Sequence, residues 1–192
     1  MREAGEHTDW LSPDEEFETS VHGSLDAAYD DPAVAEVVER IVARTEAAGR
    51  SNAVAAKLLA ITMPGVPDVY QGTELGDFSL VDPDNRRPVD FDAAAASLEA
   101  GENEKQALTA EALRLRRDRP ELFTSYDAVT VEGPAADHVL SFDRGGVVTV
   151  VTRLPIGLEA KGGWGETILR LPTGTARVAD VLADRPAALV VL

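Results

Sequence analysis

The sequence predicts a chain in two parts: a mostly helical α/β segment over residues 1–118, followed by a small all-β antiparallel sandwich over residues 119–192. Up to residue 118 most apolar residues recur at helical spacing, with one short extended run among them. Beyond Arg119 and Pro120 they occur in short runs separated by Gly and Pro, which is typical of strands and turns. The boundary is therefore expected near residues 119–125.

The first strongly periodic helix is expected over residues 32–48. Asp31 followed by Pro32 is typical of a helix start, because aspartate caps free N–H groups and proline fits the first turn. Gly49 is expected to end this helix, and a second, more apolar helix over roughly residues 52–62 should be buried. The apolar face of the first helix has the spacing i, i+3, i+4, i+7, i+8 and consists of Val34, Val37, Val38, Ile41 and Val42.

Residues 67–71 are expected to form a short buried strand, with a long polar loop over residues 72–92 leaving its C-terminal end. A third helix is expected at about residues 103–118, and Arg119 followed by Pro120 should end it. The strands expected after that read AVTVEG, HVLSF, VVTVVTRL, ETILRL and ALVVL.

An acidic run near the N-terminus resembles a metal site at first sight. A calcium loop needs alternating Asp residues followed by Gly, and that spacing is absent. The run fits better as the acidic first turn of a helix that begins at Ser12 and Pro13, where negative charge faces the helix dipole. Its members are Asp14, Glu15, Glu16 and Glu18. We therefore expect no metal and no other cofactor.

Composition excludes several classes of partner. The net charge of −16 disfavours nucleic acid and anionic membranes, which are bound by clustered Lys and Arg. With no cysteine, disulfides, thiolate catalysis and thiolate zinc sites are excluded. The first ten residues are charged and lack the apolar core of a signal peptide, so a cytoplasmic location is expected.

The segment over residues 64–91 carries the candidate binding residues. Pro64, Gly65 and Pro67 restrict its backbone, and a dense set of hydrogen-bonding side chains follows. Such a set suits a ligand rich in hydroxyl groups. An alternative interpretation is a strand end that satisfies its own loop, with two arginines neutralising neighbouring aspartates. The candidate substrate-binding residues are Tyr70, Gln71, Glu74, Asp82, Asp84, Asn85, Arg86 and Arg87.

The same segment resembles the eighth barrel strand of the α-amylase superfamily of glycoside hydrolases, which typically reads G-x-P-x-x-Y-x-G-x-E. The matching residues are Gly65, Pro67, Tyr70, Gly72 and Glu74. The continuation LVDPDNRRPVDF is similar to a narrower branch whose members rearrange the end of a maltooligosaccharide. REAGEHTDWLSPDEEFE at residues 2–18 also resembles that branch, with Gly5, Asp9 and Phe17 replacing the usual Lys, Ser and Tyr. So do residues near the C-terminus: Arg153, Gly163, Trp164, Thr167, Leu171 and Pro172.

The resemblance implies that residues 1–118 are the C-terminal part of a (β/α)8 catalytic barrel, a remnant with the last strand and its helices. It implies a maltooligosaccharide substrate and a retaining transglycosylation. It also implies that the catalytic Asp, Glu and Asp lie upstream, since the T-H-D motif that carries the last of them is absent here. No catalytic residue is assigned to this chain, and its partner would be the missing upstream catalytic region, in the same polypeptide or a split one.

An interpretation of a different class is a non-catalytic carbohydrate-binding or interaction module. Two tryptophans bear on it, because exposed aromatic rings stack on sugars. For Trp10, and for Trp164 between two glycines, a packing role is the preferred interpretation and a sugar contact the alternative.

Overall fold

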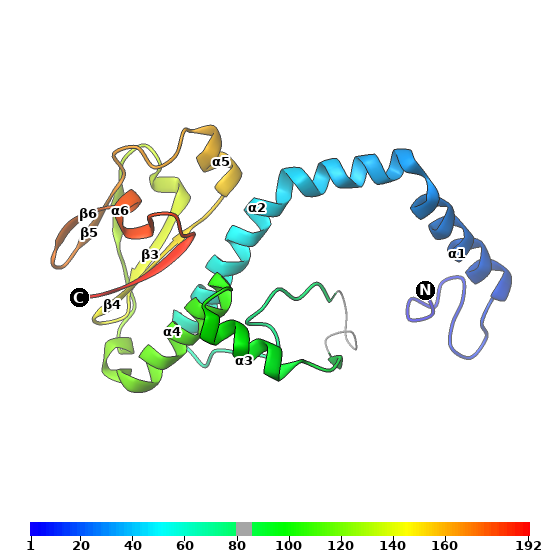
Figure 1. Cartoon of the computed structure of the whole chain (residues 1–192), viewed down its shortest axis with the longest axis horizontal. Helices are drawn as coiled ribbons and strands as arrows, with labels where there is room; N and C mark the ends of the chain where they lie inside the picture. Colours follow the sequence, from blue (N-terminus) through cyan, green and yellow to red (C-terminus); the bar gives the residue numbers. More distant parts are fainter. Residues whose placement is uncertain (80–85) are drawn as a thin grey trace. The chain divides into compact units, whose positions relative to one another are not determined.

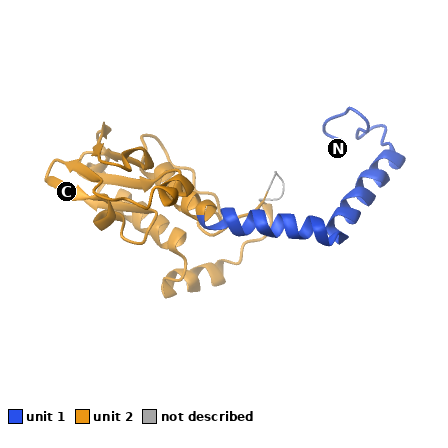
Figure 2. Ribbon diagram, turned by 90° about the horizontal axis from the view of Figure 1, so that it is seen from above, with its two compact units in different colours: residues 1–47 blue, residues 48–192 orange. Residues whose placement is uncertain are grey.

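The computed structural model describes residues 1–79 and 86–192 (Figure 1). The chain divides into two compact units, residues 1–47 and residues 48–192, which Figure 2 colours separately. Of the candidate substrate-binding residues, Asp82, Asp84 and Asn85 lie outside the described part of the chain. Each unit is described by itself below.

The first unit contains helix α1, Glu15–Asp30, and the beginning of helix α2, Pro32–Thr62. Asp14 caps α1 by accepting a hydrogen bond from the Phe17 amide, and three glutamates occupy the first turn. The acidic run is a helix start as predicted, but the helix begins at Glu15 rather than at Ser12 and Pro13. Of residues 1–47, all of which the structure describes, only Thr8 is buried. This unit therefore has almost no core of its own.

Helix α2 is continuous over Pro32–Thr62, so the predicted helix end at Gly49 is wrong. Glycine only weakens a helix interior, by about 1 kcal/mol relative to alanine, and here alanine and arginine flank it. The N-terminus is as predicted, since Asp31 Oδ1 accepts a hydrogen bond from the Ala33 amide at 2.8 Å. The predicted apolar face lies on its N-terminal half, and its side chains are 40–55% exposed. We call these five residues, Val34, Val37, Val38, Ile41 and Val42, the α2 stripe.

Two further helices belong to the second unit. Helix α4, Glu104–Asp118, is close to the predicted 103–118 and is capped by Asn103. Helix α3, Phe91–Ala100, was not predicted. It begins at Asp90, which accepts from the Ala93 amide, and ends at Gly101 in the left-handed conformation (φ +68°). The polar loop thus ends at Asp90, close to the predicted end at residue 92.

After the short 3-10 helix η2, Pro120–Phe123, the chain forms two small antiparallel sheets, as predicted. The first has the strand order β1-β3-β4-β7, with β1 Asp127–Ala128, β3 Val139–Asp143, β4 Val147–Thr152 and β7 Ala187–Val191. The second has the order β2-β5-β6, with β2 Thr130–Glu132, β5 Ile168–Leu171 and β6 Gly174–Arg177. The remaining short helices are η3 Ala136–His138, α5 Pro155–Ala160 and α6 Val178–Leu182.

Strand β4 lies at the centre of the second unit, and all six of its residues are buried. Val148 and Val150 belong to one hydrophobic cluster with Leu169 of β5 and Leu182 of α6. Val151, which points to the other face, belongs to a second cluster with residues of α2, α4 and β7. The β4 sheet is therefore covered by the other sheet on one face and by two helices on the other.

Residues 67–71, predicted as a short buried strand, do not form one. Val69 is half-buried against the helical cluster, whereas Asp68 and Tyr70 are exposed. A strand requires a neighbour for its backbone hydrogen bonds, and no strand among the described residues pairs with this segment. The strand prediction is wrong for this chain taken by itself, for that reason.

Candidate functional site

Two arginines fix the point where the chain leaves α2 and enters the candidate segment. Arg116 of α4 donates to the Ile61 carbonyl at 2.8 Å and to the Gly65 carbonyl. Arg144, which is 5% exposed, donates to the carbonyls of Thr62, Phe123 and Ser125. Cations at a helix C-terminus are favourable, because the unpaired carbonyls carry partial negative charge. Burial, and then the nearby Arg116 charge, lower the pKa of Arg144.

The Phe123 ring adds an aromatic contact to both arginines. The guanidinium carbons of Arg116 and Arg144 lie 5.5 and 5.9 Å from its centroid. Within the described residues, the hydrogen bonds that these two guanidinium groups donate go to backbone carbonyls rather than to carboxylates. These two side chains therefore serve as a clamp on backbone carbonyls at the end of α2, which sets where the segment over residues 64–79 begins.

A tight turn over residues 70–75 follows, held by two lysines. The Tyr70 carbonyl accepts from the Thr73 hydroxyl at 2.7 Å, and Lys57 Nζ of α2 donates to the same hydroxyl oxygen at 3.0 Å. Lys105 Nζ of α4 donates to the Leu75 carbonyl at 2.8 Å. Burial, and then the charge of Lys57, lower the pKa of Lys105. Two of the three lysines in the sequence thus hold this turn.

The two ends of the loop over residues 72–92 come together. Gly72 has φ +81°, and a Cβ placed there would lie 3.1 Å from Val89 Cγ2. Hydrogen bonds from Ser79 lower the pKa of Asp77, and the charges of Lys105 and Arg87 act in the same direction.

The structure brings three of the predicted site residues together on one turn. Tyr70 is 42% exposed, Gln71 is exposed and Glu74 is half-buried. Arg86 and Arg87, at the returning end of the loop, are exposed and make interactions within the chain. The structure therefore places Tyr70, Gln71 and Glu74 on one turn, and Arg86 and Arg87 on the returning end of the loop.

Sequence reasoning missed Phe78, which is 94% exposed in the same loop. Its ring lies over Gly76, since the Phe78 Cε2 atom is 3.6 Å from a Cβ built on that glycine. An exposed aromatic ring is the usual surface on which a pyranose stacks. The available signal was an aromatic residue between Asp77 and Ser79, in an otherwise polar loop.

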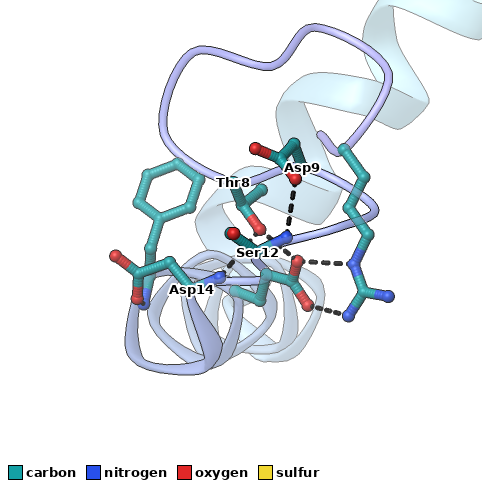
Figure 3. A network of polar contacts seen from close by, with 7 residues as sticks. Thr8, Asp9, Ser12 and Asp14 are labelled. Atoms are coloured by element: carbon teal, nitrogen blue, oxygen red, sulfur yellow. Dashed lines mark hydrogen bonds and ion pairs between the residues drawn. The ribbon is translucent and has the colours of Figure 1, made fainter.

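A separate polar network organises residues 2–18 (Figure 3). Arg2 makes a two-point contact with Glu18, at 2.7 and 2.6 Å, and the Thr8 hydroxyl donates to Glu18 Oε1 at 2.6 Å. The Asp14 amide in turn donates to the Thr8 hydroxyl oxygen at 3.0 Å. The Arg2 and Thr8 hydrogen bonds lower the pKa of Glu18 to about 2. The N-terminal segment is thereby tied to α1.

Trp10 lies beside this network and is 64% exposed, so the expected packing role is wrong for it in this chain. The Arg2 guanidinium is 5.4 Å from its ring centroid, and its indole N–H donates to Glu3 at 3.3 Å. A hollow of about 310 Å³ adjoins it, lined by Met1, Arg2, Glu3, Trp10, Glu18 and His22. Trp164, in contrast, packs partly buried against the core between the two sheets.

Metal-binding and membrane-spanning features are both lacking in residues 1–79 and 86–192. Nowhere in these ranges do three His, Asp or Glu side chains lie close enough to share a metal ion. In the same ranges, none of the helices combines the length and the apolar character that crossing a bilayer requires.

Comparison with known proteins places this arrangement in a class. No protein-family model matches the chain. The half-helical chain with two small antiparallel sheets matches, in sequence and in structure, the C-terminal portion of enzymes named for trehalose synthesis on maltooligosaccharides. The resemblance to the narrower branch that acts on maltooligosaccharides is thereby confirmed.

The particular relatives are maltooligosyl trehalose synthases. A Mycobacterium tuberculosis protein, named as a candidate maltooligosyl trehalose synthase, is 49% identical over 178 residues, which are 91% of this chain and 23% of that protein. The structure of maltooligosyltrehalose synthase from Arthrobacter ramosus is 48% identical, with a TM-score of 0.90 over 99% of this chain and 28% of the other. A Sulfolobus tokodaii protein of known structure, named as a hypothetical maltooligosyl trehalose synthase, is 29% identical, with a TM-score of 0.66 over 79% of this chain and 22% of the other. The chain spans about a quarter of the length of these relatives.

Proposed function

We propose that this chain is the C-terminal portion of a maltooligosyl trehalose synthase. The observation that carries the proposal is the 48% identity and TM-score of 0.90 with the Arthrobacter ramosus synthase, over 99% of the chain. The reaction converts the reducing-end α-1,4 linkage of a maltooligosaccharide to an α,α-1,1 linkage by intramolecular transglycosylation.

In this proposal residues 1–118 complete a (β/α)8 barrel and residues 119–192 form the β domain behind it. The barrel supplies neighbours for residues 67–71, which have no strand partner among the described residues of the chain by itself. The upstream region, in the same polypeptide or a split partner, supplies the nucleophile and the acid/base. We also propose that the protein is located in the cytoplasm.

The loop over residues 72–92 is proposed to shape the reducing-end pocket. A glucosylmutase must hold the released glucose and exclude water, because attack by water gives hydrolysis instead. A turn fixed by Lys57 and Lys105 suits that role, since its polar groups are held before the sugar binds. The residues proposed to face the sugar are Tyr70, Gln71, Glu74, Asp82, Asp84, Asn85, Arg86 and Arg87.

The test is a chimera in which this chain replaces the matching C-terminal portion of the Arthrobacter ramosus synthase. With maltopentaose, we expect loss of reducing ends and formation of a trehalose-ended product, and no activity from the chain alone. A chimera that melts cooperatively but makes no such product contradicts the proposal. Activity of the chain alone contradicts the upstream placement of the catalytic groups.

The role of the loop is tested by Glu74→Ala in the active chimera, with Glu159→Ala on the exposed surface of α5 as the matched control. We expect the first variant to release more free glucose for each trehalose-ended product, because water enters the loosened pocket. The control should keep the original ratio. Equal ratios in both variants make the loop structural only.

A second candidate, a carbohydrate-binding module, is favoured by exposed Trp10 and its adjoining hollow. It predicts that the chain alone binds maltopentaose. In a Trp164→Phe variant Trp10 is the remaining tryptophan, and sugar binding beside it should change the tryptophan fluorescence. An unchanged emission up to millimolar sugar eliminates this candidate.

A further inference from the structure

The α2 stripe is an apolar helix face that the first unit leaves exposed. Its five aliphatic side chains are 40–55% exposed and lie on one face of consecutive helical turns. Single exposed apolar residues are ordinary on proteins, but a contiguous patch marks a contact surface. We therefore expect another surface to cover these five side chains.

Nothing in the first unit covers the stripe. Helix α1 has no buried residue, and Thr8 is the one buried residue of the fully described range 1–47. Leu25 and Tyr29 of α1 are exposed as well. A unit with two helices and no core does not gain enough apolar burial to offset the entropy of ordering its chain, so it depends on a partner.

Charge argues against two of the three conceivable occupants. Residues 1–47 contain 13 acidic residues and three arginines, whereas helices that lie on membrane surfaces carry a basic polar face. A second copy of the chain is disfavoured, because two chains of net charge −16 repel one another. The length comparison favours the third occupant. The Arthrobacter ramosus synthase contains this fold and much more chain, since the matched part is 28% of it.

We infer that the α2 stripe is the docking face of the upstream portion of the synthase polypeptide. This inference rests on the proposed function, since it takes its partner from it. The partner surface is apolar, and on binding it removes the five side chains of the stripe from water. The first unit then provides a surface through which the C-terminal portion binds the catalytic region.

Thiol labelling tests the inference well, because the chain has no cysteine of its own. Val38→Cys places a thiol within the stripe, and Ala43→Cys places one on the opposite face of the same helix. Each is labelled with a maleimide in the chain alone and in the chimera with the Arthrobacter ramosus upstream region. The rate is read by mass spectrometry on the peptide that contains the substitution. We expect labelling at position 38 to slow about tenfold or more in the chimera, with position 43 unchanged.

Three results overturn the inference. Rapid labelling at position 38 in the chimera means that the stripe stays exposed, and equal protection at both positions means that the stripe is not the specific face. Protection at position 38 in the chain alone, together with a dimer in sedimentation, makes a second copy the occupant. Product formation from maltopentaose is measured on the same chimera, so that protection without activity contradicts the proposed function and activity without protection contradicts only the docking face.

Discussion

The N-terminal and C-terminal halves of helix α2 both carry aliphatic residues at helical spacing, but their surroundings differ. Val38 and Ile41 in the first half are about half exposed, whereas Leu58 and Ile61 in the second half are buried against α4, β4 and β7. Apolar spacing and helix propensity produce the helix in both halves, but burial depends on what the rest of the chain supplies. The difference teaches that an amphipathic pattern indicates a need for a partner, and the partner can lie in another part of the protein.

The sharpest way to break this comparison is to shorten one aliphatic side chain in each half. We expect Leu58→Ala to lower the free energy of unfolding by about 2–5 kcal/mol, because it leaves a cavity in the core. Val38→Ala in the chain alone should change it by no more than about 0.5 kcal/mol. Urea unfolding followed by circular dichroism measures both. Equal losses would mean that the stripe is already covered in the isolated chain.

The buried half also depends on Arg144, which donates to the Thr62 carbonyl at its end. Arg144→Met keeps much of the apolar stem but leaves three carbonyls without a donor, so we expect a loss of about 1–3 kcal/mol. Arg170→Met is the control, because its pair with Glu132 is exposed and contributes only about 0–1 kcal/mol. Thermal unfolding of the two variants compares them. A smaller loss of stability for Arg144→Met than for Arg170→Met would mean that Arg144 does not stabilise the end of α2.

Gly49 lies where the two halves meet. Because α2 is continuous there and a Cβ on Gly49 meets nothing within 4 Å, Gly49→Ala should stabilise the chain by about 0.5–1 kcal/mol and raise its helicity. Gly101→Ala is the contrasting control, since φ +68° at the end of α3 disfavours alanine and the substitution should destabilise. Loss of helicity in Gly49→Ala would restore the helix break that the sequence predicts.

The smallest expected effect is local to the first unit and depends on pH. The pKa of Glu18 is about 2, below its ordinary 4.5, so its contribution to stability is complete above about pH 4.5 and is lost as the pH falls toward 2. NMR titration of its carboxylate carbon should show this midpoint. Arg2→Gln should raise the midpoint while the Glu132 carboxylate, paired with Arg170, stays unchanged. A midpoint near 4.5 in the unaltered chain would contradict the network.

Local signals predicted most of the secondary structure. Asp31 and Pro120 marked helix ends correctly, and short apolar runs marked strands of the two antiparallel sheets. Helix α3 was missed, although Asp90, a run of alanines and Gly101 are ordinary start and stop signals. The strand over residues 67–71 was predicted from local sequence alone. A strand forms only when a neighbouring strand pairs with its backbone, and the local sequence of a segment does not show whether such a neighbour is present.

The polar residues of the candidate site could be predicted from the sequence, but the side chains that hold their backbone in place could not. Tyr70 and Glu74 were proposed because they match the motif, and Gln71 because it is a hydrogen-bonding side chain next to Tyr70. Lys57 and Lys105 are far apart in sequence, and the packing of α2 and α4 in one cluster brings them to the same turn. The clamp of Arg116 and Arg144 was equally hidden, because arginines that bind backbone carbonyls leave no charge pattern in the sequence.

The scarcity of lysine has a practical consequence for anyone who attaches this chain to a surface or a dye. Coupling reagents that attack amines find Lys57, Lys105 and Lys161 besides the terminal amine, and the first two hold the turn over residues 70–75. The lowered pKa of Lys105 enlarges the neutral, reactive fraction of its amine at any given pH. Amine coupling would therefore loosen the loop that one intends to study. Replacing Lys57 and Lys105 with arginine keeps both cations and directs the reagent to exposed Lys161, at a distance from the turn in the sequence.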